Sequence, residues 1–539
     1  MDTVVASMRQ WADTKPEAVV FTFVNKHGVT GEYTPRAVYE QAGRFASRLR
    51  RYGFTKGDVI ANGLPNSPER LVTDMGIIMA GCVMVNAQVF EVDGSDFFLT
   101  ANYSNCKGVI LYKKNNNAMF KLFEPLIGQN CAEYTEVFVQ QAPSLTKLLL
   151  CSRVKGDLTP LLQGLGQEDI FSDAETSPSD LAVLFTTSGT SGFSKLVPRT
   201  HEQILQAGRS FQGGNVKYFS DRPFGWMGGF PFDYIVFCSL RVLQDKLTDD
   251  FAETSTDIWD VISREQCTGA AMLPIAILDL IHTYTTSKPS YKIPFIVTGG
   301  QPITRNLSPA VGLLTDALVV TYSSTECAMV SVGVVTSADQ MKDNFVGKPG
   351  KDVSLTIVDD SNNPVAANEE GLILLKSPFI LTNYLPAVAS SSIFTPDGYF
   401  ITGDRGLLDE SGNLFCFGRA GDLISQGPLL VYTSWPEKVL SKCPDVADVV
   451  VLIMSVMGND DGFYACVVPK PGSAVTKESL IDFYTSSFMT STTSEKFKPE
   501  LADIFLFERF PQTFTGKVNK SRLKDLVLQQ LCVNSTAVA

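Results

Sequence analysis

The stretch LFTTSGTSGFSKLVPRTH, residues 184–201, joins a short apolar run to a loop of small and hydroxylated residues that ends at Lys195. Glycines lack side-chain bulk, so backbone N–H groups can converge on an anion, while hydroxyls add donors and a lysine adds a point charge. The loop residues are Thr187, Ser188, Gly189, Thr190, Ser191 and Gly192. Because Leu196 follows the lysine, the pattern is not a P-loop. We interpret it as a polyphosphate-binding loop of another kind, with a Ser/Gly-rich surface turn as the alternative.

Two further apolar runs end in small polar residues, IPFIVTGG at 293–300 and DALVVTYSSTE at 316–326. Together with DLAVLFTT at 180–187, they read as buried strands that lead into loops. Strands that alternate with helices favour an α/β fold with a doubly wound sheet. Ligands bind at the carboxyl ends of the strands in such sheets, so we expect these three strand ends to face one crevice.

Other segments carry local signals for helices and strands. Residues 34–54 predict a helix, because Pro35 lies near its start and Gly53 follows its arginine-rich end. Residues 67–87, SPERLVTDMGIIMAGCVMVNA, predict one strongly buried helix, and 107–112 and 135–140 predict short strands.

The pattern of apolar and turn-forming residues changes after residue 350. Alternating strands joined by Asp/Asn/Gly turns predict a β-rich subdomain over about 345–420, within a large N-terminal domain of 1–420. From residue 421, two helical and two strand patterns predict a small α+β domain that extends to 539.

Composition excludes several classes of protein. The 539 residues carry a net charge of −12 and contain no block of Lys and Arg, which argues against a nucleic-acid partner. The longest apolar run, MGIIMAGCVMV at 75–85, is too short to cross a membrane. Eleven scattered cysteines, no signal-peptide pattern and no C-terminal Ser-Lys-Leu lead us to expect a cytoplasmic or other intracellular protein.

Four motifs follow the loop in order: TYSSTE at 321–326, YFITGDRG at 399–406, GRAGD at 418–422 and PQTFTGKVNKSRL at 511–523. With the loop, they make the chain resemble the adenylate-forming superfamily, which includes acyl-CoA synthetases, peptide-synthetase adenylation domains and beetle luciferases. The family loop reads T-S-G-[ST]-[ST]-G-x-P-K-G, and here Ser194 replaces its proline and Leu196 its last glycine. The resemblance extends from Thr34 to Leu523.

The resemblance implies a two-step reaction. A carboxylate attacks the α-phosphate of ATP to give an acyl-adenylate and pyrophosphate, and a thiol, here coenzyme A, then displaces AMP. Two anions repel each other, so this chemistry needs cations and hydrogen-bond donors more than acid–base groups. By resemblance, the loop and Lys195 hold the β- and γ-phosphates, Thr325 contacts the α-phosphate, and Glu326 binds Mg²⁺, which prefers oxygen ligands.

The remaining site residues are also assigned by resemblance. Tyr322 of the YSSTE motif would stack its ring on the adenine, and Ser323 would also bind the nucleotide. Gly299 and Gly300 belong to the segment TGGQP, which resembles the family's adenine-flanking loop; Gly300 is assigned to the nucleotide and Gly299 to the pocket of the acid substrate. Asp404 would accept hydrogen bonds from the ribose hydroxyls.

Three assignments concern the C-terminal motifs. Arg419 would contact ribose or phosphate, with a structural salt bridge as the alternative. Lys517 would be the catalytic lysine that the mobile C-terminal domain brings to the carboxylate and the α-phosphate. Gly421, two residues beyond Arg419, would be the hinge of that domain.

Two departures from the family pattern affect the substrate and the second step. Trp226 stands where relatives commonly have a histidine. We interpret it as part of a reshaped acyl or thiol pocket that favours a flat apolar acid, with a core tryptophan as the alternative. Ser425 stands where many relatives carry a lysine used in the second half-reaction. The leading interpretation is therefore an acid–thiol ligase of the acyl-CoA synthetase type. The alternatives are a luciferase-like enzyme, an adenylating enzyme that loads a separate carrier, and a nucleotide-binding paralogue without turnover.

Overall fold

The computed structural model describes most of the chain. The described residues are 2–87, 94–113, 117–127, 133–151, 165–171, 176–187, 195–210, 216–248, 250–284, 288–387, 393–426, 429–455, 462–489, 499–512 and 518–536. They form two compact units. The first unit contains the described residues within Met1–Thr187, Ser194–Thr402 and Leu407–Cys416, and the second contains Gly403–Gly406 and those within Phe417–Ala539.

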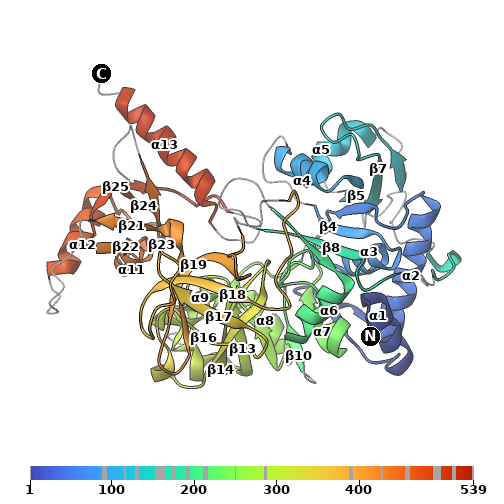
Figure 1. The fold of residues 1–539 in the computed structure, drawn as a ribbon, viewed down its shortest axis with the longest axis horizontal. Helices are drawn as coiled ribbons and strands as arrows, with labels where there is room; N and C mark the ends of the chain where they lie inside the picture. Colours follow the sequence, from blue (N-terminus) through green and yellow to red (C-terminus); the bar gives the residue numbers. More distant parts are fainter. Residues whose placement is uncertain are drawn as a thin grey trace. The chain divides into compact units, whose positions relative to one another are not determined.

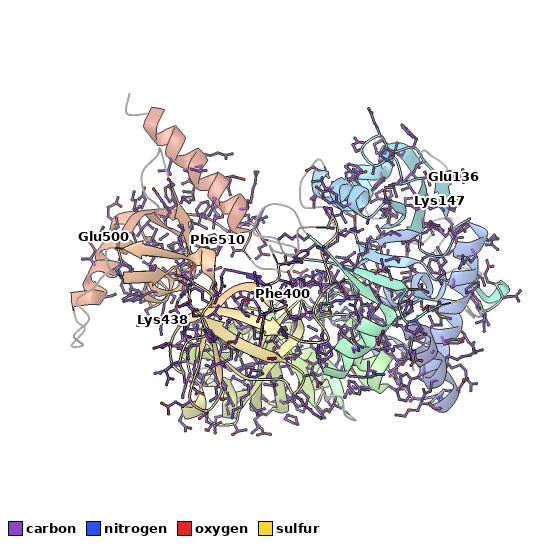
Figure 2. All side chains as sticks on the ribbon, in the orientation of Figure 1. Glu136, Lys147, Phe400, Lys438, Glu500 and Phe510 are labelled. Atoms are coloured by element: carbon purple, nitrogen blue, oxygen red, sulfur yellow. The ribbon has the colours of Figure 1, made fainter. Side chains whose placement is uncertain are left out.

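A seven-stranded sheet lies in the first unit (Figure 1), in the order β6-β7-β5-β3-β4-β8-β9. Its strands are β3 (Val59–Asn62), β4 (Val83–Asn86), β5 (Cys106–Tyr112), β6 (Tyr134–Glu136), β7 (Lys147–Cys151), β8 (Leu181–Thr186) and β9 (Leu196–Thr200). The five inner strands run parallel, and β6 and β9 are antiparallel to their neighbours. Lys147 and Glu136, labelled in Figure 2, form an ion pair of 3.4 Å across the β6 edge.

Helices cover both faces of this sheet because successive residues of its inner strands are apolar and point to opposite faces. Val59 and Ala61 belong to one hydrophobic core and Ile60 to another. The first core includes residues of α4 (Ser95–Tyr103) and α5 (Ala118–Ile127). The second includes residues of α2 (Pro35–Arg51) and α3 (Pro68–Met79). This two-sided burial is typical of parallel sheets in α/β proteins.

Local signals explain where two of these helices begin and end. The side chain of Thr34 accepts a hydrogen bond from the N–H of Ala37, and Pro35 occupies the first turn of α2, as its sequence predicts. The expectation of one helix over 67–87 is wrong at its end. Gly81 adopts a positive φ of 67° after α3, and the following Val83–Asn86 segment is the buried strand β4.

A thirteen-stranded sheet accounts for most of the remaining first unit, in the order β17-β18-β19-β20-β16-β15-β14-β13-β12-β10-β11-β1-β2. Its strands are β1 (Phe21–Val24), β2 (Val29–Tyr33), β10 (Lys217–Phe219), β11 (Leu240–Gln244), β12 (Gly269–Ala271), β13 (Ile293–Gly299), β14 (Thr315–Ser324), β15 (Ala328–Val335), β16 (Phe345–Pro349), β17 (Ser354–Val358), β18 (Gly371–Lys376), β19 (Phe400–Leu408) and β20 (Leu414–Arg419). The associated helices are α1 (Val4–Thr14), α6 (His201–Ser210), α7 (Phe232–Phe237), α8 (Ser255–Arg264), α9 (Pro274–Thr283) and α10 (Ala310–Leu313). The strands after residue 345 thus extend this sheet.

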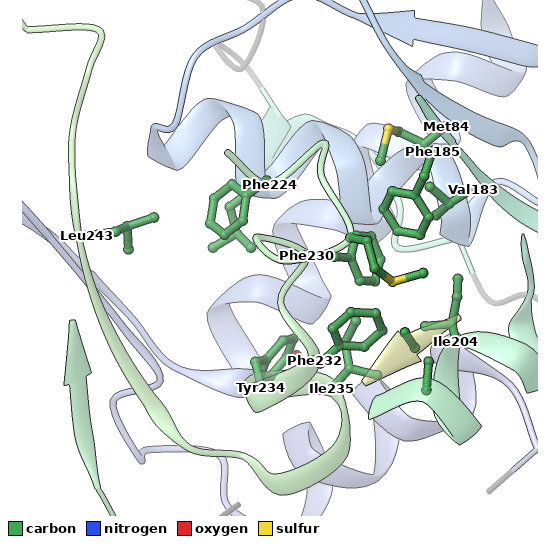
Figure 3. Close-up of a cluster of buried hydrophobic side chains, with 14 of the residues drawn as sticks. Met84, Val183, Phe185, Ile204, Phe224, Phe230, Phe232, Tyr234, Ile235 and Leu243 are labelled. Carbon is green, nitrogen blue, oxygen red and sulfur yellow. The ribbon is translucent and has the colours of Figure 1, made fainter. Parts of the chain in front are cut away.

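Aromatic side chains pack between the two sheets. Phe185 of β8 meets Phe230 edge to face, with ring centroids 5.5 Å apart, and Phe230 in turn meets Phe232 at 5.2 Å. Figure 3 shows these rings in one cluster with Met84 of the seven-stranded sheet and Ile204 of α6. The sheet that carries β8 is therefore fixed against the segment that leads into β11.

The second unit is a small α+β structure. It contains β21 (Leu423–Gln426), β22 (Leu429–Tyr432), α11 (Ser434–Leu440), β23 (Val446–Met454), β24 (Gly462–Pro469), α12 (Lys477–Met489), β25 (Leu501–Leu506) and α13 (Lys520–Thr536). In the sheet β23-β24-β25, Val451 packs with Leu480 of α12, whereas Leu452 packs with Leu523 of α13. Phe510, labelled in Figure 2, belongs to the second of these clusters.

The mixed α/β fold expected from the sequence is confirmed. Across the described ranges, no helix combines the length and the apolar composition needed to cross a membrane.

Candidate functional site

The strands β8 and β9 form a hairpin whose connecting loop is the Gly/Ser/Thr stretch. Thr187 and Lys195 close its base, because the N–H of Thr187 donates to the carbonyl of Lys195 at 2.9 Å and the N–H of Lys195 donates to Thr187 Oγ1 at 3.1 Å. The other predicted loop residues lie outside the described residues, as does the predicted catalytic lysine: Ser188, Gly189, Thr190, Ser191, Gly192 and Lys517. Their assignments stay predictions.

Arg199 connects this hairpin to the YSSTE motif. It lies on β9, four residues after Lys195, and its side chain is fully buried. Nη2 donates to the carbonyls of Thr325 at 2.8 Å and Glu326 at 2.9 Å, and Nη1 donates to the carbonyl of Phe379 at 2.6 Å. Burial lowers the pKa of Arg199 to about 10, so the guanidinium stays charged at neutral pH.

These contacts change the expectation that the three polar strand ends face one crevice at the edge of one sheet. The three polar strand ends do not share a sheet, because β8 belongs to the seven-stranded sheet and β13 and β14 to the other. The end of β14 meets the β8–β9 hairpin through Arg199 instead.

Tyr384 lies between the two charged residues predicted to bind phosphate and metal. Its O–H donates to Glu326 Oε1 at 2.9 Å, and the Nζ of Lys195 is 4.7 Å from the centroid of its ring. The neighbouring Leu385 exchanges two backbone hydrogen bonds with Leu196, at 2.9 and 3.3 Å. The structure therefore brings Lys195 and Glu326 to opposite parts of one tyrosine side chain. The sequence analysis missed both Tyr384 and Arg199.

The donor chemistry at Glu326 fits a magnesium ion that also binds nucleotide. Within the described residues, no group of three or more His, Cys, Asp and Glu side chains is placed to hold a metal ion. Mg²⁺ in nucleotide sites commonly takes one or two carboxylates and completes its shell with phosphates and water. A single carboxylate held beside a lysine is compatible with that arrangement.

The neighbouring strand ends are tightly packed. Gly299 of β13 pairs with Thr321 of β14, and a Cβ at Gly299 would lie 2.4 Å from the carbonyl oxygen of Thr321. Gly300 has a positive φ of 76° and an open space where a Cβ would be. Tyr322 and Ser323 follow on β14 at a register shift against β15. Such bulges often re-aim side chains beside functional sites.

Trp226 lies half-buried in a turn over residues 223–229. The backbone N–H of Trp226 donates to the carbonyl of Pro223 at 3.0 Å, and the backbone carbonyl of Trp226 accepts from the N–H of Phe230 at 2.7 Å. Asn86 at the end of β4 packs so closely on this turn that a Cβ at Gly225 would lie 2.3 Å from its Oδ1. The turn that presents Trp226 is therefore anchored to the seven-stranded sheet.

The second unit holds the predicted ribose residues. Arg419 Nε lies 3.2 Å from Asp404 Oδ1, and the Asp404 side chain is 11% exposed against 51% for Arg419. An ion pair between them is thus present. Ribose hydroxyls would have to share the Asp404 carboxylate with this arginine.

The predicted hinge lies in a 3₁₀ turn, Ala420–Asp422. A Cβ at Gly421 would meet no atom within 4 Å, so neighbouring atoms do not require glycine there. Asp422 forms an ion pair of 2.9 Å with Lys520 at the start of α13. Ser425 lies on β21, where its backbone pairs with Leu430 of β22.

The described fold, with two α/β sheets and a separate small α+β unit, is that of an adenylate-forming enzyme. A solved structure with the same fold is the anthranilate CoA ligase AuaEII in complex with anthranoyl-AMP. It aligns with a TM-score of 0.80 over 98% of each chain, at 17% identity. Residues 8–385 match the family described as AMP-binding enzyme. The chain belongs to this AMP-binding enzyme family.

Curated relatives cover nearly all of the chain. The salicylyl-CoA synthase/salicylate adenylyltransferase of Streptomyces sp is 24% identical and covers 96% of this chain and 93% of its own length. The 4-coumarate–CoA ligase 1 of Arabidopsis thaliana is 25% identical, and the alignment covers 92% of this chain and 88% of that relative's length. These relatives support activation of an acid through an adenylate by this chain, and the family resemblance expected from the motifs is confirmed.

Proposed function

We propose that this protein uses ATP and Mg²⁺ to activate a carboxylic acid as an acyl-adenylate and then transfers the acyl group to the thiol of coenzyme A. The observation that carries the proposal is the contact of Lys195 and Glu326 with Tyr384, next to the closed base of the Gly/Ser/Thr loop. A cation and a carboxylate that can bind a metal, both near the base of a Gly/Ser/Thr loop, suit a triphosphate substrate.

Each residue then has a defined task in adenylation. The loop and Lys195 hold the β- and γ-phosphates, and Thr325 orients the α-phosphate. Glu326 holds Mg²⁺, which when bound neutralises charge on the phosphate oxygens. Tyr322, Ser323 and Gly300 border the adenine. This arrangement brings two anions together without an acid–base group, because fixed charges and donors offset their repulsion.

The second unit would complete the site in our proposal. Lys517 is assigned to the attacking carboxylate and the α-phosphate, and Asp404 and Arg419 to the ribose. Rotation at Gly421 would withdraw Lys517 after adenylation and allow the thiol step, since conformational steps of this kind separate half-reactions in many enzymes.

We propose an aromatic carboxylic acid as the substrate class. Two relatives are named for salicylate and 4-coumarate, and the AuaEII structure holds anthranoyl-AMP. The anchored, half-buried indole of Trp226, with Gly299 at the end of β13, would offer a flat apolar wall for a planar ring.

The test is acid-dependent exchange of pyrophosphate into ATP, measured without any thiol. Salicylate, 4-coumarate, anthranilate and a medium-chain fatty acid are compared, and AMP release is then measured with and without coenzyme A. We expect exchange with at least one aromatic acid and AMP release that requires coenzyme A. Lys517→Ala should lose exchange and retain ATP binding. Absence of exchange with every acid would refute the proposal, and exchange without coenzyme A-dependent AMP release would refute its second step.

A further inference from the structure

The turn that carries Glu326 is held in a conformation that its own sequence does not favour. It joins the antiparallel strands β14 and β15, and Ala328 at its end has a positive φ of 56°. A residue with a Cβ is disfavoured in this left-handed region and stays there only when its surroundings hold it. The carbonyl of Glu326 accepts from the N–H of Leu381 at 2.8 Å, and Ser324 Oγ accepts from the N–H of Cys327 at 3.2 Å.

Arg199 adds a further restraint on this turn. Its Nη2 binds the two successive carbonyls of Thr325 and Glu326, and a guanidinium presents several donors in a rigid fork that suits such a pair. Its hydrogen-bond partners among the described residues are all carbonyls, so the group is not half of a buried ion pair with a described carboxylate. The contact also ties the turn to β9, which begins one residue after Lys195.

Tyr384 acts on the side chain of Glu326 rather than on its backbone. A lysine and a glutamate in the same region tend to pair, which would neutralise both charges before a nucleotide arrives. Here Lys195 and Glu326, both described, form no ion pair with each other. The tyrosine ring faces the ammonium and the hydroxyl binds the carboxylate.

We propose that Arg199 and Tyr384 are positioning residues that together form a clamp on Glu326, Arg199 through the backbone and Tyr384 through the side chain. The clamp keeps Glu326 apart from Lys195 and oriented for the metal of a metal–nucleotide complex. This inference rests on the proposed function, because it presumes that Glu326 binds Mg²⁺ there.

The clamp is tested by comparing Tyr384→Phe with a matched control, Tyr291→Phe. Tyr384→Phe keeps the ring beside Lys195 and removes the donor to Glu326. Tyr291→Phe removes a tyrosine hydrogen bond of the same 2.9 Å length, to the carbonyl of Cys267, elsewhere in the first unit. ATP binding is measured by calorimetry with Mg²⁺ and with EDTA, and the Mg²⁺ concentration for half-maximal pyrophosphate exchange is measured in parallel.

We expect Tyr384→Phe to weaken ATP binding about tenfold in Mg²⁺ and to leave binding in EDTA unchanged, since a hydrogen bond to a charged group is lost. Its half-maximal Mg²⁺ concentration should rise similarly, whereas Tyr291→Phe should match the wild type in both. Equal Mg²⁺ dependence in the two variants would overturn the inference.

Arg199→Lys gives an independent measurement, because it keeps the charge and loses the fork. We expect a raised Mg²⁺ requirement in the folded fraction, confirmed by circular dichroism, and a wild-type requirement would count against the clamp. If the wild type binds ATP more tightly with Mg²⁺ yet exchanges no pyrophosphate, the proposed function fails and the binding comparison still decides the clamp. If Mg²⁺ has no effect on ATP binding by the wild type, the clamp is refuted.

Discussion

Protonation of His201 should destabilise the first unit in acid. His201 follows β9 directly, its side chain is 1% exposed, and its Nδ1 accepts the N–H of Val4 at 3.3 Å. Burial lowers the pKa of His201 from 6.5 to about 4; the negative charge of Asp180 opposes this with a smaller effect, and the positive charge of Lys56 lowers the pKa further. Those two groups pair with each other at 2.8 Å. The imidazole is therefore neutral in the folded protein over a range in which the unfolded chain takes up a proton.

The size of this loss of stability follows from the shift in the pKa of His201. Above pH 6.5 both states carry a neutral imidazole and the full stability is present. As the pH falls from 6.5 to about 4, only the unfolded state binds the proton, so the free energy of unfolding decreases. A shift of roughly 2.5 pKa units corresponds to about 3 kcal/mol.

His201→Asn removes this titration, because the Asn Oδ1 takes the place of Nδ1 as an uncharged acceptor. Urea unfolding of both proteins is followed at pH 7, 6, 5 and 4. We expect the wild type to lose about 3 kcal/mol more than the variant between pH 7 and 4. The control His27→Asn removes an exposed histidine and should keep the wild-type decrease. Equal slopes for His201→Asn and the wild type would refute the assignment.

Three further outcomes are expected. Gly299→Ala should destabilise the protein by about 3 kcal/mol, because its Cβ would lie 2.4 Å from a backbone oxygen. Gly300→Ala should cost only about 1–2 kcal/mol, because the site is open and only its positive φ disfavours alanine. Equal decreases in the melting temperature of the two variants would contradict this. Arg419→Ala should weaken ATP binding. It should reduce the free energy of unfolding by less than about 1 kcal/mol, because the arginine of its ion pair with Asp404 is half exposed. A large loss of stability with unchanged ATP binding would favour a purely structural ion pair. Burial raises the pKa of Glu437 from 4.5 to about 7. As the pH rises from 4.5 through 7, the unfolded chain loses this proton before the folded protein does, so the stability of the second unit should decrease. Glu437→Gln should abolish up to about 3 kcal/mol of that decrease in chemical unfolding, and an unchanged pH profile would disprove it.

Local sequence signals predicted much of the secondary structure because they act over a few residues. The cap at Thr34 and the proline after it define the start of α2, and apolar runs define β8, β13 and β14. The end of α3 was predicted wrongly, since an apolar run suits a buried helix and a buried strand equally well and Gly81 divides the two.

The sequence by itself determined the family, the α/β class and the identity of the charged candidates, because motif order and hydrophobic periodicity are properties of the chain. Only the tertiary structure decided how those candidates meet. Arg199 binds carbonyls 126 to 180 residues away, and Tyr384 reaches Glu326 across 58 residues. Carbonyl groups are present at every residue and carry no sequence signature, so no motif could mark Arg199 as their partner. The physical reason is that a buried guanidinium hydrogen-bonds to the acceptors that tertiary packing brings within its reach, and for Arg199 these are carbonyls that bind Nη1 and Nη2, while Nε has no partner among the described residues.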